Sequence, residues 1–133
     1  MDQLSFYRCP HCGNVIVKTV DSGVPVVCCG GPMQRLVPHT EDMGQEKHLP
    51  VVGRSCRIAS QNCSLTIRVG SEPHPMTPEH HIEWICLEHQ DGFQLRRLSA
   101  SDPPYAEFCY GKERATAVYE YCNLHGLWKT VIQ

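Results

Sequence analysis

The stretch Tyr121-Cys122-Asn123-Leu124-His125-Gly126, near the end of the chain, holds a cysteine and a histidine three residues apart, just before a glycine. In a strand the two side chains would diverge, whereas in a tight loop both can face one metal ion. A Cys-x-x-His pair alone is weak evidence for a site. Its meaning depends on the other ligands that the chain supplies.

Cysteine and histidine are both frequent in this sequence. Its 133 residues include nine cysteines and eight histidines. An odd number of cysteines without a recognisable secretion signal argues against a disulfide framework and favours thiols held by metal in a reducing cytoplasm. The composition therefore predicts a cytoplasmic metalloprotein.

Charge and hydropathy argue against two classes of partner. The formal net charge is −2 at pH 7 and no basic stripe is present, so nucleic acid is a poor partner. No apolar run approaches the ~20 residues that a membrane-spanning helix needs. We expect neither nucleic acid nor a membrane as a partner.

Four cysteines near the N-terminus form a second metal-binding pattern. The knuckle Cys9-Pro10-His11-Cys12-Gly13 lets both sulfurs bind one ion, and the adjacent pair Cys28-Cys29 can join them if Gly30 and Gly31 bend the backbone. Strand signals at residues 14–20 and 24–27 flank the turn Asp21-Ser22-Gly23. Four thiolates suit zinc and iron about equally, and such a site can serve folding alone. The predicted ligands are Cys9, Cys12, Cys28 and Cys29.

The rest of the chain alternates short strand signals with turn signals. A polar segment at 38–45, bracketed by proline and glycine, is interpreted as a linker. Beyond it, Leu65, Ile67 and Val69 alternate with polar residues, and Asp91-Gly92 marks a hairpin. About seven strands and no helical period are expected, which is typical of an immunoglobulin-like sandwich or a small barrel. The predicted organisation is all-β, with a four-Cys metal domain at 1–37, a linker at 38–45 and a second domain at 46–133.

Histidines in the second domain fall at the ends of predicted strands. His48 precedes one strand, and His74 and His80 share a loop that three prolines stiffen. A lone histidine is more often a satisfied polar residue than a ligand, but four at strand ends beside a Cys-x-x-His favour a site. The predicted donors are His48, His74, His80, Cys122 and His125.

These motifs occur together in one known family. They are Cys9-x-x-Cys12 with Cys28-Cys29, Glu46-Lys47-His48-x-Pro50, His74-Pro75-Met76 with His80, Ile82-Glu83-Trp84-Ile85, and Glu120-Tyr121-Cys122-Asn123-Leu124-His125-Gly126. In order and spacing the sequence closely resembles superoxide reductase of the two-iron, desulfoferrodoxin class. The resemblance covers nearly the whole chain.

The resemblance implies a fold, two metals and an activity. It implies a desulforedoxin-like iron domain, an immunoglobulin-like catalytic domain and a homodimer. One iron would be held by the four N-terminal cysteines, and the other by four equatorial histidines and an axial Cys122. A five-coordinate ferrous site with an open sixth position would reduce superoxide by one electron to hydrogen peroxide. The electron donor would be rubredoxin or a similar small carrier.

Glu46 and Lys47, next to His48, are the candidate catalytic residues. Lys47 would attract superoxide and orient a water that protonates the product. Glu46 would fill the sixth position after oxidation of the iron. Both can act at one face only if this stretch is a loop, because alternate residues of a strand point to opposite sides.

Alternatives remain open from the sequence. His81 follows His80, and the spacing from His74 favours His80 as the ligand. The protein could also be a non-catalytic iron or zinc carrier or metal-binding module, or a dismutase, and zinc could replace iron at the four-cysteine site. Of the remaining cysteines, Cys86 and Cys109 are expected to be buried, while a redox role for Cys56 and Cys63 has no support from sequence.

Overall fold

The computed structural model describes residues 4–42, 47–57, 62–110 and 114–132, and it contains no helix among them. All of its regular elements are β-strands, which confirms the all-β class. The chain divides into two compact units, Met1–Val37 and Pro38–Gln133. Residues 38–42, which the sequence suggested as part of a linker, therefore fall within the second unit.

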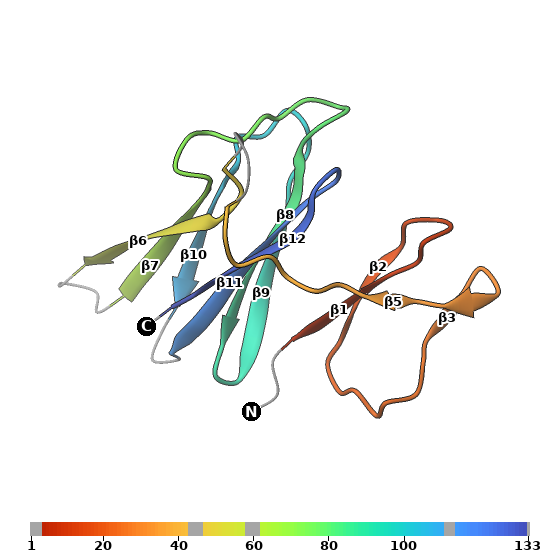
Figure 1. The fold of residues 1–133 in the computed structure, drawn as a ribbon. Coiled ribbons are helices and arrows are strands. Elements are labelled where there is room, and N and C mark those ends of the chain that lie inside the picture. Colours follow the sequence, from red (N-terminus) through yellow and green to blue (C-terminus); the bar gives the residue numbers. More distant parts are fainter. Residues whose placement is uncertain (1–3, 43–46, 58–61, 111–113, 133) are drawn as a thin grey trace. The chain divides into compact units, whose positions relative to one another are not determined.

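The first unit is built from short strands around the cysteines (Figure 1). Its strands are β1 (Ser5–Arg8), β2 (Val15–Lys18), β3 (Val27–Cys28), β4 (Gly31–Pro32) and β5 (Gln34–Arg35). They form one sheet in the order β2-β1-β5 and a second, two-stranded sheet of β3 and β4. Among the described residues of this unit, only Phe6, Cys9 and Met33 are buried apolar side chains. So small a core needs a further cross-link to be stable.

Two tight turns carry the cysteines of the first unit. At the first, Gly13 has a φ of 83° and its N–H donates to the Cys9 carbonyl oxygen at 3.0 Å. At the second, positive φ angles occur at Cys29 (55°) and Gly30 (78°), whereas Gly31 already lies in β4. The bend expected at Gly30-Gly31 is therefore one residue earlier.

The strand predicted at residues 24–27 is largely wrong. Only Val27 lies in a strand, and β2 pairs with β1 rather than with this segment. Pro25 lacks the N–H that a ladder needs. Val24 and Val27 are 68% and 64% exposed, so no buried face favours an extended strand here.

The second unit is a sandwich of two antiparallel sheets (Figure 1). Its strands are β6 (Pro50–Arg57), β7 (Asn62–Val69), β8 (Ile82–His89), β9 (Gly92–Arg97), β10 (Tyr105–Tyr110), β11 (Ala115–Cys122) and β12 (Gly126–Val131). One sheet has the order β10-β7-β6 and the other the order β12-β11-β8-β9. These seven strands in the described residues confirm the number expected from sequence.

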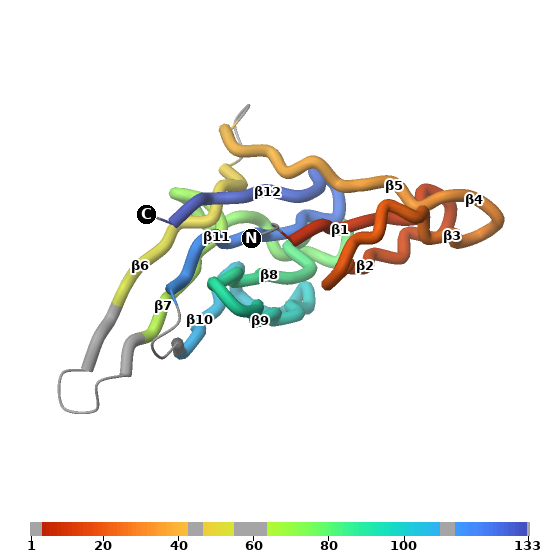
Figure 2. The backbone as a smooth tube through the Cα atoms, turned by 90° about the horizontal axis from the view of Figure 1, so that it is seen from below, coloured from red at the N-terminus to blue at the C-terminus, as the bar shows by residue number. Residues whose placement is uncertain are grey.

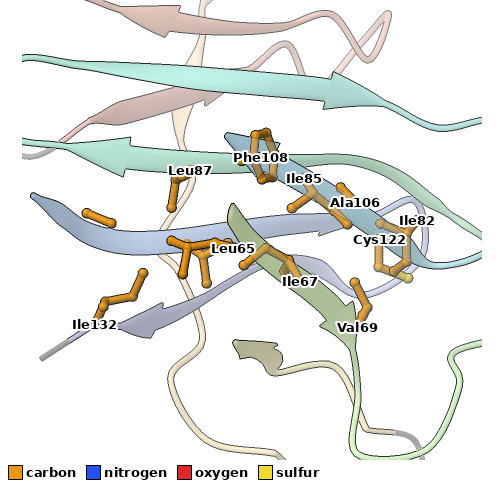
Figure 3. Packing of buried hydrophobic residues seen from close by; sticks show 12 residues of the cluster. Leu65, Ile67, Val69, Ile82, Ile85, Leu87, Ala106, Phe108, Cys122 and Ile132 are labelled. Carbon is orange, nitrogen blue, oxygen red and sulfur yellow. The ribbon is translucent and has the colours of Figure 1, made fainter. Parts of the chain in front are cut away.

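Side chains from both sheets fill the space between them (Figure 3). On β7 the alternating Leu65, Ile67 and Val69 are at most 1% exposed and meet Ile85 and Leu87 of β8 in the same cluster. Complete burial of one such side chain contributes about 1.5–3 kcal/mol. The alternation read from the sequence therefore identified the core face of β7 correctly.

Strand β11 ends in an irregularity that places Cys122. Its register with β8 shifts between Tyr121 and Cys122, so that Cys122 pairs with Ile82. A bulge of this kind re-aims the side chain that follows it. Cys122 is fully buried and belongs to the core cluster, so its thiol lies at the inner end of the sandwich.

Candidate metal centre

Five potential ligands gather at one end of the sandwich. His48 precedes β6, His74 and His80 lie in the β7–β8 loop, Cys122 ends β11 and His125 precedes β12. One donor atom from each lies within 4.8 Å of the others. The structure thus brings together all five donors that the sequence predicted for this site.

The four imidazoles form a closed ring. Successive ring centroids are 4.7 Å apart for His48 and His74, 4.7 Å for His74 and His80, 5.1 Å for His80 and His125, and 4.8 Å for His125 and His48. Four nitrogens in a square about 2.1 Å from a central ion would be about 3.0 Å apart along each edge. His48 Nε2 and His125 Nδ1 are 3.1 Å apart. The ring therefore fits a single metal ion.

The thiol of Cys122 approaches this ring from the protein interior. Its Sγ is 3.7 Å from His74 Nε2 and 3.8 Å from His125 Nδ1, which belong to opposite corners of the ring. Cys122 is fully buried, whereas His125 is exposed and His80 half-buried. The sulfur therefore reaches the ring from its buried side, and solvent reaches the ring at its edge. Imidazole and thiolate together suit zinc, copper and iron.

The His74 tautomer is set by a backbone contact. Its Nδ1 lies 2.8 Å from the carbonyl oxygen of Pro75, which can only accept a hydrogen bond. Nδ1 must therefore carry the proton, which leaves the lone pair of Nε2 for a metal. Ligating histidines are commonly fixed in this way.

His48 is held by a residue that the sequence pattern placed in the linker. The Asp42 carboxylate oxygen Oδ1 accepts the N–H groups of His48 at 2.8 Å and Leu49 at 3.0 Å. Trp128 stacks on the His48 ring with centroids 4.5 Å apart and an interplanar angle of 10°. Asp42 therefore fixes the backbone of His48, and Trp128 fixes its ring.

The loop that carries His80 is tied to the Cys-x-x-His turn. Asn123 Oδ1 accepts the N–H of His81 at 2.9 Å, and Asn123 Nδ2 donates to the carbonyl oxygen of Glu79 at 2.9 Å. His81 itself turns its Nδ1 to the Thr77 carbonyl oxygen at 2.9 Å and lies outside the group of donors. His80, rather than His81, is the member of the group.

A glycine allows the His48 segment to approach β7. Gly70 has a φ of 84°, and a Cβ there would collide with the backbone carbonyl oxygens of Lys47 and Glu72. The Gly70 N–H also donates to the Leu49 carbonyl oxygen at 3.1 Å. Only glycine can occupy this position without moving the segment that carries His48.

The two candidate catalytic residues differ in what the structure describes. Lys47 is half-buried and directly precedes His48. Glu46 lies outside the described residues. A further carboxyl group, that of Glu120, is completely buried, and burial followed by the charge of Asp42 raises the pKa of Glu120 well above its usual range.

The four N-terminal cysteines also meet at one point. One sulfur of each lies within 4.8 Å of the others, with Cys12 Sγ 3.6 Å from Cys28 Sγ and Cys28 Sγ 4.0 Å from Cys29 Sγ. A tetrahedron of sulfurs about 2.3 Å from a metal has edges of about 3.8 Å. The two measured edges bracket this value, so the adjacent cysteines can share an ion as predicted.

The pKa shifts of these thiols show why a cation would stabilise the group. The backbone N–H of Cys12, which donates to Cys9 Sγ at 3.5 Å, lowers the pKa of Cys9 to about 6. The neighbouring Cys12 sulfur raises the pKa of Cys29 to about 12 and also raises that of Cys28. A negative charge on one sulfur of the group thus disfavours a negative charge on the next. A bound cation would relieve this repulsion.

Sequence reasoning missed the residues that position the ligands and misplaced one cysteine. Asp42, Gly70 and Trp128 carry no sequence signal for a site, although Asn123 lies inside the Cys-x-x-His motif.

Cys86 is fully buried as expected, but Cys109 is exposed, so its predicted burial is wrong. It alternates with the buried Ala106 and Phe108 on β10 and thus belongs to the outer face.

Comparisons with known proteins agree with this arrangement. The family model described as desulfoferrodoxin matches residues 40–131, and the model of the desulfoferrodoxin N-terminal domain matches residues 2–36. A desulfoferrodoxin from Nitratidesulfovibrio vulgaris is 40% identical over 129 residues, covering 96% of both chains. A superoxide reductase from Pyrococcus horikoshii is 38% identical over 106 residues, covering 69% of this chain and 90% of the relative.

Solved structures show the same fold. The crystal structure of the superoxide reductase from Treponema pallidum superposes with a TM-score of 0.80 at 32% identity, covering 96% of this chain and 98% of the other. A superoxide reductase (neelaredoxin) from Archaeoglobus fulgidus gives a TM-score of 0.55 at 29% identity, covering 71% and 95% of the two chains. In the described part of the chain, no helix is long and apolar enough to cross a membrane. Both halves of this chain, with their two clusters of metal ligands, belong to the desulfoferrodoxin family.

Proposed function

We propose that the protein is a superoxide reductase, which adds one electron and two protons to superoxide to give hydrogen peroxide. The observation that carries this proposal is the group of His48, His74, His80, Cys122 and His125, whose donor atoms lie within 4.8 Å of one another at a partly exposed end of the sandwich. Relatives and structural neighbours that carry the name superoxide reductase support it.

The five donors would hold a ferrous ion, which would supply the single electron. Four neutral imidazoles and one thiolate leave a net positive charge at a divalent ion, and that charge favours an anionic substrate. The burial of Cys122 keeps water from its sulfur, while the exposure of His125 leaves the edge of the site open to a small molecule. His74 contributes Nε2 because its Nδ1 proton is engaged by Pro75.

Lys47 and Glu46 are proposed as the residues that handle substrate and product. The Lys47 ammonium, on the residue before a ligand, would attract superoxide and favour binding of the anion. Glu46, one residue further, is proposed to occupy the free position of the oxidised site. The half-buried setting of Lys47, outside any strand, supports a role at the site mouth.

The four-cysteine site is proposed to hold a second iron. The spacing of its sulfurs and the opposed pKa shifts of Cys9 and Cys29 support a bound cation, and four thiolates accept zinc as well. An iron there is compatible with electron transfer and with a purely structural role, whereas zinc would serve folding alone. We further propose a homodimer, a small electron donor such as rubredoxin, and a cytoplasmic location. The described cysteines form no disulfide, as is usual in a reducing compartment.

The stoichiometry of the reaction tests the proposed function. Anaerobically purified, reduced protein is mixed with superoxide, and peroxide and dioxygen are measured together with metal content. A reductase yields one peroxide per superoxide and no dioxygen. A dismutase yields one peroxide and one dioxygen from two superoxide ions, and a non-catalytic carrier consumes none beyond the spontaneous reaction.

Two variants sharpen this test. Cys122→Ser should abolish reductase activity, and Cys109→Ser, on an exposed residue, should leave it unchanged. Two iron ions per chain would support the proposal. Two zinc ions, or full activity of Cys122→Ser, would overturn it.

A further inference from the structure

A side-chain amide of the first unit reaches one sulfur of the four-cysteine site. The chain carries Cys9 and Cys12 in the turn from β1 into β2, and Cys28 and Cys29 in the turn from β3 into β4, and the two turns lie side by side (Figure 2). The amide nitrogen Nδ2 of Asn14 donates to Cys28 Sγ at 3.6 Å. The other described groups that contact this sulfur are thiols of the same cluster. Asn14 is therefore the contact of Cys28 Sγ that is not itself a ligand.

The backbones of donor and acceptor are both held in place. The Asn14 carbonyl oxygen accepts the N–H of Cys9 at 2.8 Å, and the next residue, Val15, begins β2 opposite Arg8. Cys28 lies in β3 opposite Gly31 of β4. The contact between the amide and the sulfur therefore has to order only two side chains, and the entropy of the backbone does not oppose it further.

The contact from Asn14 does not depend on the protonation of the thiols. Cys9 Sγ lies 3.7 Å from the Cys28 carbonyl oxygen and can donate to it only as a thiol. Cysteine binds a metal as the thiolate, so this donor is lost when the site is loaded. The amide of Asn14 keeps its hydrogens in either state. Asn14 can therefore donate to the Cys28 sulfur of a metal-bound site.

We propose that Asn14 raises the reduction potential of an iron held by the four cysteines, and so favours the uptake of an electron there. An iron bound by four thiolates carries one more negative charge when reduced than when oxidised, and the sulfurs share that charge. A hydrogen bond to Cys28 Sγ stabilises the more negative form more strongly. Hydrogen bonds to ligating sulfurs are among the factors that set the potentials of thiolate-bound iron. This role depends on the iron proposed for the site.

Two substitutions of Asn14 remove the donor and leave the backbone carbonyl oxygen that binds Cys9. Asn14→Leu exchanges the amide for an apolar side chain of similar size, and Asn14→Asp adds a negative charge beside Cys28. For Asn14→Leu we expect electron uptake to be about tenfold less favourable, which is a potential about 59 mV lower for one electron. Asn14→Asp should lower the potential further. The matched control is Gln34→Leu, which removes another exposed amide of the first unit and should keep the parent potential.

A redox titration of the full chain measures this potential. Iron is loaded into both sites in vitro, so the result does not depend on which metal the four cysteines hold in the cell, and the thiolate absorption bands are followed. Cys122→Ser removes the thiolate of the second unit and so shows which bands belong to the four-cysteine site. The iron of the second unit is the internal reference, and its potential should be the same in the parent, both Asn14 variants and the Gln34 control.

The outcomes separate this role from a structural one and from the proposed function. A parent-like potential in iron-loaded Asn14→Leu would overturn the role of the amide. Failure of Asn14→Leu to bind iron would overturn it as well, because Asn14 would then serve the folding of the site. A lowered potential, together with no peroxide formed from superoxide, would support the role of Asn14 and count against the proposed function, since the superoxide reaction is assigned to the second unit.

Discussion

Asn123 joins the β7–β8 loop to the turn between Cys122 and His125, because its side-chain oxygen accepts the backbone N–H of His81 at 2.9 Å. Its amide nitrogen donates to the Glu79 carbonyl oxygen, and its own N–H donates to the His81 carbonyl oxygen at 3.2 Å. The residue before His80 and the residue after it are thus both bound to the turn between Cys122 and His125. Two side-chain hydrogen bonds and one backbone hydrogen bond of Asn123 therefore hold the His80 segment against this turn.

Removal of that side chain should loosen the metal site. We expect Asn123→Ala to weaken binding of Co²⁺ at this site by about 10- to 100-fold, as loss of a positioning contact commonly does. The change in the cobalt–thiolate absorption on titration measures the affinity. Leu124→Ala, at a 59% exposed residue in the same turn, is the matched control and should bind as the parent does. Equal affinities of the two variants would show that Asn123 has no such role.

Asp42 should stabilise the second unit through its two backbone partners. In Asp42→Ala the N–H groups of His48 and Leu49 lose their acceptor, which costs about 1–3 kcal/mol for each that stays buried. Asp42→Asn retains Oδ1 as an acceptor and should lose much less. The free energy of unfolding in urea distinguishes these variants, with the exposed Glu41→Ala as control. If Asn were as destabilising as Ala, the charge of Asp42 and not its hydrogen bonds would matter.

The difference between these positioning residues and the ligands explains how much the sequence could predict. The ligands were identifiable because a metal ion binds only a few types of side chain, and those types occur here at the ends of predicted strands. They are His48, His74, His80, Cys122 and His125. Asp42 acts on backbone N–H groups, which several polar residues could bind, so only the folded geometry shows its role. Residues 24–27 have strand propensity, but their valines are left exposed, and nothing in the local sequence shows that.

Gly70 provides a test that separates backbone strain from collision. Gly70→Ala combines a positive φ, which costs about 1–2 kcal/mol for alanine, with a Cβ that would displace the Lys47–His48 segment. Gly126 has the same φ of 84°, but a Cβ at Gly126 would have no atom within 4 Å, so Gly126→Ala carries the strain alone. We expect both variants to lose stability in urea and Gly70→Ala to lose clearly more. Equal losses would exclude a collision at the His48 segment.

The thiols of Cys86 and Cys109 should differ in their reactivity towards an alkylating reagent. Burial, and then the charge of Glu88, raises the pKa of Cys86 from 9.0 to about 12, so the folded protein keeps a proton that the unfolded chain releases. The stability that this thiol contributes is complete below pH 9 and is lost as the pH rises towards about 12. At pH 8.5, iodoacetamide should label the exposed Cys109 and not Cys86, as peptide mass spectrometry would show. Labelling of Cys86 in the folded protein would contradict its burial.

Lys47 should affect the encounter with superoxide and not the binding of iron. Loss of its positive charge in Lys47→Ala is expected to slow the bimolecular reaction by about tenfold at low salt, the lower end of the range for electrostatic steering. The dependence of the rate on ionic strength should become flatter, because the screened attraction is gone. Lys47→Arg retains the charge and should retain most of the rate, while metal content stays equal in all three proteins. Stopped-flow or pulse-generated superoxide gives the rates over a series of salt concentrations. A parent-like rate and salt dependence in Lys47→Ala would mean that another cation attracts the substrate.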